Sequence, residues 1–249
     1  MKALTILPTL NERDNLARMV ESISLVAVSP QVRRLGIEEI KVLVVDDDSP
    51  DGTGAIADEL AARTDFRVAV LHRHERGRAT AGIAGFKYAL ANTDAEYILE
   101  MDCDFSHNPD DIPRLLEAAK TYDVVVGSRF IHEGKARRRM ILRAGISRGA
   151  SVLARVVLGM KIRDPHGGFR CYRRAALAAL DWNSIRSKGY AIEMELLYRL
   201  QNLGCSCTEV PIVFEERRAG KSKFSLRFAL EYVAVAIRLR LGQPRRRRA

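Results

Sequence analysis

The sequence lacks long hydrophobic runs, and this absence argues against a membrane-spanning protein. Its 249 residues contain no stretch of about 18 uncharged apolar residues, the length that a transmembrane helix requires. The apolar run within residues 1–8 is also too short for a secretory signal peptide. We therefore expect a cytoplasmic protein that neither enters a secretory route nor crosses a bilayer.

Paired cysteines and glycine-rich nucleotide loops are missing as well. The four cysteines, at positions 103, 171, 205 and 207, form no Cys-x-x-Cys pair and have no histidine at a spacing suited to zinc. They are typical of reduced cytosolic cysteines. No Gly-x-Gly-x-x-Gly follows the first predicted strand, and a P-loop is absent. These absences argue against a zinc protein, a dinucleotide-binding fold and a P-loop NTPase.

Basic residues are in excess, with 41 Lys and Arg against 31 Asp and Glu, for a formal net charge of +10. Such a balance favours an anionic partner, namely a nucleotide, a phosphorylated lipid, a membrane surface or a nucleic acid. The chain is also 47% hydrophobic. At this length it can bury a large core, as single α/β domains do.

Strand and helix patterns alternate through the first half of the chain. Continuous apolar strands are predicted at residues 3–7, 42–45, 68–71, 97–101 and 123–126. Apolar residues at helical spacing predict helices around residues 16–23, 56–60, 83–90 and 112–119, with Asn11 and Asp14 placed as a capping box for the first of them. This alternation indicates a mostly parallel, Rossmann-like sheet with helices on both faces.

Polar clusters follow four of the predicted strands. They are Pro8–Glu12, Asp46–Thr53, Asp102–Asp104 and Gly127–Arg129. One cluster alone could be a turn, because Asp, Ser, Pro and Gly form turns for their own reasons. Parallel strands, however, bring their carboxyl ends to one edge of the sheet, where ligands of such folds bind. Carboxylates together with backbone donors at helix starts suit a nucleotide and a divalent metal.

The pair Asp102 and Asp104 is the most informative of these clusters. If the strand that begins near residue 98 continues through them, their side chains point the same way, so both reach one divalent cation. Two adjacent carboxylates are costly to bury unless a cation, a proton or hydrogen bonds compensate. The alternative is that Asp104 or Asn108 caps the helix beginning near Pro109, with Asp111 completing a capping box.

Taken in order, these motifs resemble the family 2 glycosyltransferases of the nucleotide-sugar-binding A-type fold, and among them the dolichyl-phosphate (polyprenyl-phosphate) mannose synthases. The similarity extends from about residue 3 to about residue 223. Besides the four clusters, it is carried by the segments Ile146–Ala150, Arg163–Arg170 and Arg217–Lys223. The resemblance implies inverting transfer of mannose from GDP-mannose to a polyprenyl monophosphate at the cytoplasmic membrane face.

The resemblance also implies a role for each matching residue. The guanine and ribose of GDP-mannose would be held by Pro8, Asn11, Glu12, Asp46, Asp47 and Asp48. Asp102 and Asp104 would bind Mg²⁺ or Mn²⁺, and Arg129, Arg217 and Lys223 would neutralise phosphate charge. The acceptor phosphate would meet Arg143, Ser147 and Arg148. The catalytic set is then Asp104, Arg129 and Arg217. His107 and His166 lie inside motifs but receive no catalytic role.

Two basic segments point to the membrane. Residues 133–155 contain seven basic residues and one acidic residue, interleaved with apolar side chains, and residues 224–249 have the same balance. In the second segment Phe228, Tyr232, Val235 and Leu239 share a helical face. We expect a catalytic domain over 1–223 and an amphipathic helix with a basic tail over 224–249, which attaches the protein peripherally to an anionic membrane, where a membrane-embedded partner protein is possible. The alternative is a packed terminal helix with a solvated basic end.

Three departures from the family pattern bear on the substrate. The segment His74–Gly82 lacks the usual Lys and Gly-x-Gly, Leu10 replaces a common Tyr, and Gly167 replaces a common Ser. They leave open another nucleotide sugar or a soluble specialised-metabolite acceptor. A basic nucleic-acid-binding protein is a third interpretation, suggested by the charge alone. It does not account for the carboxylates along the sheet edge, so we expect no nucleic-acid partner.

Overall fold

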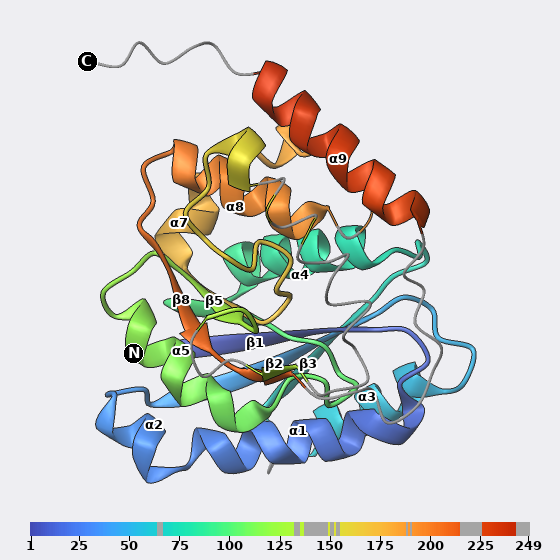
Figure 1. Ribbon diagram of the computed structural model, residues 1–249. Coiled ribbons are helices and arrows are strands. Elements are labelled where there is room, and N and C mark those ends of the chain that lie inside the picture. The colour runs from blue at the N-terminus through green and yellow to red at the C-terminus, as the bar shows by residue number, and fades with distance from the viewer. Residues whose placement is uncertain are drawn as a thin grey trace.

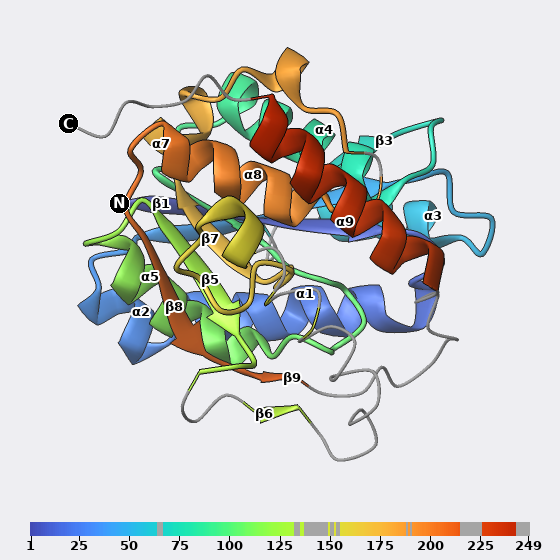
Figure 2. The same ribbon diagram turned by 45° about the horizontal axis from the view of Figure 1, so that its top comes forward.

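The computed structural model describes residues 1–63, 67–131, 135–136, 149, 152, 155–187, 189, 191–214 and 226–242. Its centre is a seven-stranded sheet in the order β3-β2-β1-β4-β7-β5-β8 (Figure 1). The strands are β1 Lys2–Thr9, β2 Glu39–Asp46, β3 Val68–His72, β4 Tyr97–Glu100, β5 Val124–Ser128, β7 Arg170–Arg173 and β8 Cys207–Pro211. Beside the sheet, β6 Lys135–Ala136 pairs with β9 Val213–Phe214 (Figure 2).

The sheet is parallel except at β7, which pairs antiparallel with both β4 and β5. Strands β1, β2, β4 and β5 therefore run in one direction, and their carboxyl ends meet at one edge. This confirms the predicted mostly parallel sheet and the shared edge of the polar clusters. The antiparallel β7 was not anticipated, because no strand was predicted beyond residue 126.

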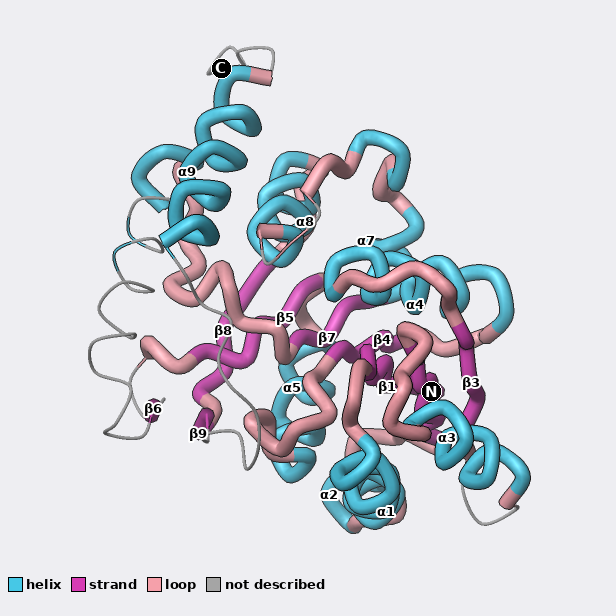
Figure 3. The backbone as a smooth tube through the Cα atoms, turned by 90° about the vertical axis from the view of Figure 1, so that its right-hand side faces the viewer, coloured by secondary structure: helices cyan, strands magenta, loops and turns pink. Residues whose placement is uncertain are grey.

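Helices cover both faces of the sheet, as Figure 3 shows edge-on. One layer holds α1 Arg13–Ala27, α2 Pro30–Arg34, α3 Thr53–Ala62, η1 Pro109–Asp111 and α5 Ile112–Ala119. The other holds α4 Arg78–Asn92, α7 Arg174–Ala178, η3 Trp182–Ser184, α8 Ile192–Asn202 and α9 Leu226–Leu241. Successive side chains of a strand pack on opposite faces of the sheet. In β2, Leu43 and Val45 pack against the second helix layer, and Val42 and Val44 pack against the first. Burial on both faces explains why the strands are continuous apolar runs.

Helix α9 packs its apolar face onto the protein. Tyr232, Val235 and Leu239 are 5%, 6% and 7% exposed and belong to the core beside α8. Arg238 adds an ion pair to the buried Glu195, at 3.3 Å. Part of the face expected to enter a membrane is therefore already covered by protein, as in the packed-helix alternative. None of the helices in the described residues is long and apolar enough to cross a membrane.

The capping box predicted at the start of α1 is wrong. The helix begins after Glu12, whose side chain makes no capping hydrogen bond. Asn11 has a φ of 61°, and its backbone N–H donates to Ser49 Oγ at 3.1 Å. The entry to α1 is thus fixed by the loop that follows β2 rather than by a local cap.

Candidate active site

Asp102 and Asp104 lie in the turn that follows β4. The strand ends at Glu100, so the prediction that both aspartates extend the strand is wrong. The charges of both carboxylates nevertheless influence the same neighbour, the ring of His107. Burial lowers the pKa of His107, while the charges of Asp102 and Asp104 oppose that shift. The Asp102 backbone N–H donates to His107 Nδ1 at 3.0 Å, which makes the ring a neutral acceptor at that atom.

Of the two residues considered as a helix cap, Asn108 is the one that caps η1. Its Oδ1 accepts a hydrogen bond from the backbone N–H of Asp110 at 3.1 Å, at the start of η1. Asp104 Oδ1 instead accepts from the Ser106 N–H at 3.0 Å, within the turn itself. Asp104 is 4% exposed. The turn thus buries a carboxylate that the helix does not need as a cap.

The two aspartates offer hard oxygen ligands, which suit Mg²⁺ or Mn²⁺. Among the described residues, no group of three or more His, Cys, Asp and Glu side chains is gathered to hold a metal ion. A pair of carboxylates fits a cation whose other ligands come from a bound diphosphate and water, as Mg²⁺ usually requires. The donor set therefore fits the implied metal as part of a complex with the nucleotide.

Arg78, the first residue of α4, contacts three carboxylates. Its Nη2 lies 3.0 Å from Asp102 Oδ1 and 3.7 Å from Glu193 Oε1, and its Nη1 lies 3.4 Å from Glu100 Oε1. Burial raises the pKa of Glu100, and it raises that of Glu193 to about 7. Beside them Arg170 is fully buried and donates to the carbonyl oxygens of Gly167, Pro165 and Glu193. Charged groups are thus concentrated beside the turn that carries Asp102 and Asp104.

The three aspartates after β2 have different surroundings. Asp46 is buried and accepts from Ser49 Oγ at 2.6 Å and from Thr9 Oγ1 at 3.3 Å, so it ties its loop to β1. Asp47 accepts from Arg73 and from the Gly77 N–H, the latter at 2.8 Å, and its burial raises its pKa. Asp48 is exposed and has a φ of 53°. Of the three, Asp48 is the carboxylate that faces solvent.

The loop after β1 is hydrogen-bonded to the loop after β2 that carries these aspartates. Pro8 is half-buried within β1. Glu12 donates its backbone N–H to Thr53 Oγ1 at 2.9 Å, and its Oε2 accepts from Asn15 at 2.8 Å. Together with the Asn11–Ser49 contact, these bonds make the loops after β1 and β2 a single unit. The structure therefore brings together the residues predicted to hold the base and ribose.

Arg129, which follows β5, is already paired. Its Nε donates to Asp164 Oδ2 and its Nη2 to Asp164 Oδ1, both at 2.8 Å, and the guanidinium lies 5.2 Å from the ring centres of Phe130 and Phe214. Burial would lower the pKa of Arg129, but the charges of Asp164 and Asp102 outweigh it and raise that pKa. Arg129 lies at the predicted edge, with Nε and Nη2 of its guanidinium engaged by Asp164.

Other predicted residues lie outside the described part of the chain. These are Arg143, Ser147, Arg148, Arg217 and Lys223. Conversely, sequence reasoning missed Arg78, Asp164 and Glu193. Asp164 sits in the quoted Arg163–Arg170 motif and Arg78 in the segment that departs from the family pattern, so both positions carried a signal. Glu193 had none, because it lies on α8, which was not predicted.

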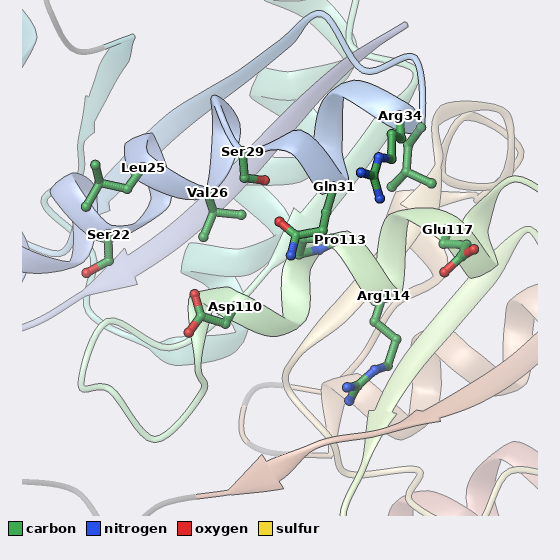
Figure 4. A pocket seen from close by; sticks show the side chains of 11 residues that line it. Ser22, Leu25, Val26, Ser29, Gln31, Arg34, Asp110, Pro113, Arg114 and Glu117 are labelled. Carbon is green, nitrogen blue, oxygen red and sulfur yellow. The ribbon is translucent and has the colours of Figure 1, made fainter.

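A separate groove lies away from this edge. It has a volume of about 850 Å³ and runs between α1 and α2 on one side and η1 and α5 on the other (Figure 4). Its lining includes Leu25, Gln31, Arg34, Arg114 and Glu117. None of the predicted site residues is among the side chains that line it. The candidate active site is therefore the acidic edge rather than this groove.

Comparison with solved structures defines the class of fold. Glucosyl-3-phosphoglycerate synthase from Mycobacterium tuberculosis, solved with Mn²⁺, UDP and glucosyl-3-phosphoglycerate, superimposes with a TM-score of 0.68 at 21% identity, over 98% of this chain and 81% of that one. The same enzyme solved with Mg²⁺ and UDP gives a TM-score of 0.65 at 22% identity, over 98% and 80% of the two chains. The fold is thus that of A-type glycosyltransferases.

Sequence comparison gives the family. Residues 5–181 match the model of glycosyl transferase family 2, and the chain belongs to this family. It is 41% identical to polyprenol monophosphomannose synthase of Mycolicibacterium smegmatis, over 98% of this chain and 90% of that one. It is 42% identical to undecaprenyl-phosphate mannosyltransferase of Micrococcus luteus, over 90% and 88% of the two chains. Dolichol-phosphate mannosyltransferase of Pyrococcus furiosus is 35% identical, over 96% of this chain and 64% of its own. The resemblance inferred from the motifs is confirmed.

Proposed function

We propose that the protein transfers mannose from GDP-mannose to a polyprenyl monophosphate, with inversion at the anomeric carbon. The observation that carries this proposal is the similarity over nearly the whole chain to relatives named as polyprenyl-phosphate mannosyltransferases. The acidic edge of the sheet is consistent with it, since carboxylates can bind ribose hydroxyls and a cation while nearby arginines face phosphate.

The loops after β1 and β2 hold the nucleoside in this proposal. Asp48 is exposed and supplies a carboxylate for the base or ribose, whereas Asp46 and Asp47 keep their loop in place through Ser49, Thr9 and Gly77. Pro8, Asn11 and Glu12 form the facing wall. Because these two loops are joined by hydrogen bonds, the nucleoside site is largely formed before the donor binds.

Asp102 and Asp104 would hold Mg²⁺ or Mn²⁺ against the donor diphosphate. The cation would stabilise the negative charge that develops on the departing nucleoside diphosphate. Arg129 stays close to that charge while Asp164 fixes the plane of its guanidinium. Arg217 and Lys223 would add further positive charge from the segment before α9.

No strong general base is needed for this reaction. A phosphate monoester has a second pKa near about 6, so the acceptor is already largely anionic at neutral pH. The protein then has to align the acceptor oxygen with the anomeric carbon and stabilise the leaving group. This agrees with the surroundings of His107 and His166, whose burial lowers their pKa values. In the proposal, Arg143, Ser147 and Arg148 hold the acceptor phosphate.

Access to a lipid acceptor requires a membrane surface. We propose peripheral association through the basic residues of segments 133–155 and 224–249, where a membrane-embedded partner is a further possibility. The part of α9 that faces away from the core carries Ile237, Arg240 and Leu241, all of them exposed. Binding therefore depends on charge and on a few exposed apolar side chains, rather than on the buried face of α9.

Donor choice is tested by the thermal shift that GDP-mannose, GDP and UDP-glucose produce in the presence of Mn²⁺. We expect stabilisation by both guanosine compounds and little by UDP-glucose. Stabilisation by UDP-glucose alone would reject GDP-mannose as donor and leave the family assignment intact. Transfer to a water-soluble acceptor, with none to a polyprenyl phosphate, would reject the lipid acceptor.

A further inference from the structure

The position of Arg78 bears on how the metal site is assembled. Its guanidinium contacts three carboxylates: Glu100 at the end of β4, Asp102 in the turn that follows β4, and Glu193 on α8. The side chains of Glu100 and Glu193 are 6% and 5% exposed, whereas that of Asp102 is 23% exposed. Of these three carboxylates, Asp102 is therefore the most exposed to solvent, and it is one of the two proposed metal ligands.

The site for Arg78 is shaped by a glycine. A Cβ atom added to Gly168 would lie 2.9 Å from Arg78 Nη2, so any larger residue would push the guanidinium from its place. Charge also favours this place, because the carboxyl groups of Glu100, Asp102 and Glu193 all lie against Arg78. The charge of the fully buried Arg170 acts on Glu100 and Glu193 as well, but its donors are taken by carbonyl oxygens.

We propose that Arg78 is a positioning residue that occupies Asp102 in the metal-free protein and releases it when the divalent cation binds. A cation on Asp102 and the guanidinium of Arg78 compete for the same carboxylate, and their like charges repel. After release, Arg78 keeps its two buried partners, Glu100 and Glu193. This inference rests on the proposed metal role of Asp102 and Asp104, and it makes metal affinity depend on a residue that does not touch the metal.

The test is Mn²⁺ binding to the full chain, measured without substrates by the loss of the free-Mn²⁺ electron paramagnetic resonance signal. We expect Arg78→Gln to tighten Mn²⁺ binding about tenfold, because a competing like charge beside the ligand is removed. Glu193→Gln should weaken Mn²⁺ binding, because Arg78 then has fewer partners other than Asp102. Lys87→Gln, which removes an exposed positive charge elsewhere on α4, is the matched control and should leave the affinity unchanged.

The double variant separates positioning from a general electrostatic field. If Glu193 acts through Arg78, Glu193→Gln has little effect once Arg78 is already Gln. If both residues act only through their fields, the two effects add, and that result would overturn the inference. Arg78→Lys covers the case in which Arg78→Gln does not fold, as judged by circular dichroism. It keeps the competing charge, so its Mn²⁺ affinity should stay close to that of the wild type, and a tightening of about tenfold in Arg78→Lys would contradict the inference.

The proposed metal site is tested by the same titration. Wild-type binding that is lost in Asp104→Ala establishes the site, and the Arg78 variants then decide the inference alone. Equal binding by the wild type and Asp104→Ala would instead reject the metal site, and with it the basis for a competition at Asp102.

Discussion

Arg129 and Asp164 form a two-pronged ion pair in which both N–O distances are 2.8 Å. Asp164 also accepts the backbone N–H of Arg129 at 3.1 Å, and its side chain has no exposed surface. The charge of Arg129 lowers the pKa of Asp164 despite its burial. The pair joins the end of β5 to the segment before β7, and so fixes one wall of the candidate active site, where the charge of Asp102 also acts on Arg129.

Breaking this pair should strongly destabilise the fold. We expect Asp164→Ala to lower the free energy of unfolding by about 3–5 kcal/mol, because it leaves a buried guanidinium without its partner. The matched control is Asp94→Ala, which breaks the exposed pair between Lys2 and Asp94 and should cost far less stability, because both partners stay solvated when the pair is broken. Urea unfolding followed by circular dichroism measures both. Equal small losses would show that the Arg129–Asp164 pair does not hold the wall in place.

Burial of a neutral histidine should make stability depend on pH. Burial lowers the pKa of His166 from 6.5 to about 3, and its ring lies 3.9 Å from that of Tyr232, centre to centre. The unfolded chain binds a proton here below about pH 6.5 and the folded chain does not, so stability is full above that value and falls by up to about 1.4 kcal/mol per pH unit below it.

His166→Phe tests this dependence, because it keeps a ring against Tyr232 and removes the titrating group. We expect the variant to lose less stability than the wild type between about pH 7 and pH 5, a window that lies above the titration of unfolded carboxylates. Thermal unfolding at both pH values measures it. If His166→Phe loses as much stability between the two pH values as the wild type does, His166 is not the source of the pH dependence. The buried His107, whose pKa is also lowered, remains in the variant and leaves a residual dependence.

The departure at Gly167 has a steric explanation. A Cβ atom at this position would lie 2.8 Å from the backbone oxygen of Gly127 and 3.1 Å from Val126 Cγ1. Because the backbone of β5 cannot move like a flexible side chain, we expect Gly167→Ser to cost about 1–3 kcal/mol of stability. Urea unfolding measures the cost. A variant as stable as the wild type would show that β5 and this segment separate more easily than the structure indicates.

The two faces of α9 should respond differently to substitution. Tyr232→Ala removes a buried ring, and we expect it to lower stability by about 3 kcal/mol or more. Ile237→Asp changes a residue that is 47% exposed and should alter stability by no more than about 0.5 kcal/mol. Only Ile237→Asp should reduce sedimentation with anionic vesicles. Loss of vesicle binding in a well-folded Tyr232→Ala variant would indicate that the buried face of α9 is the membrane contact.

The sequence predicted the sheet well because its parallel strands are buried on both faces. Residues 42–45 and 124–126 are uninterrupted apolar runs, and the structure places them in β2 and β5. The edge clusters followed from the rule for parallel strands. The antiparallel β7 was harder to predict, since Arg170–Arg173 contains two arginines and no apolar run. Arg170 is nevertheless fully buried, because carbonyl oxygens from Pro165, Gly167 and Glu193 accept its donors.

The sequence pointed to several residues of the candidate site, but it did not predict which side chains contact one another there. Asp102 and Asp104 were chosen for an alternation that the structure does not have, because β4 ends at Glu100. The turn still places both carboxylates near His107. The partners Asp164, Arg78 and Glu193 come from distant segments, and such long-range pairs have no local pattern in a single sequence. The same holds for α9, whose periodicity fits both a protein core and a membrane surface.

The central claim is tested most directly by transfer of radiolabelled mannose from GDP-mannose to a short polyprenyl phosphate, with and without Mn²⁺. The comparison uses the wild type, Asp104→Ala, and Asp110→Ala as a control that removes an exposed carboxylate a few residues away. We predict a lipid-extractable product that forms only with the cation, persists in Asp110→Ala and is lost in Asp104→Ala. Product formation by a folded Asp104→Ala variant at the wild-type rate, or without any divalent cation, would contradict the proposed role of the carboxylate pair.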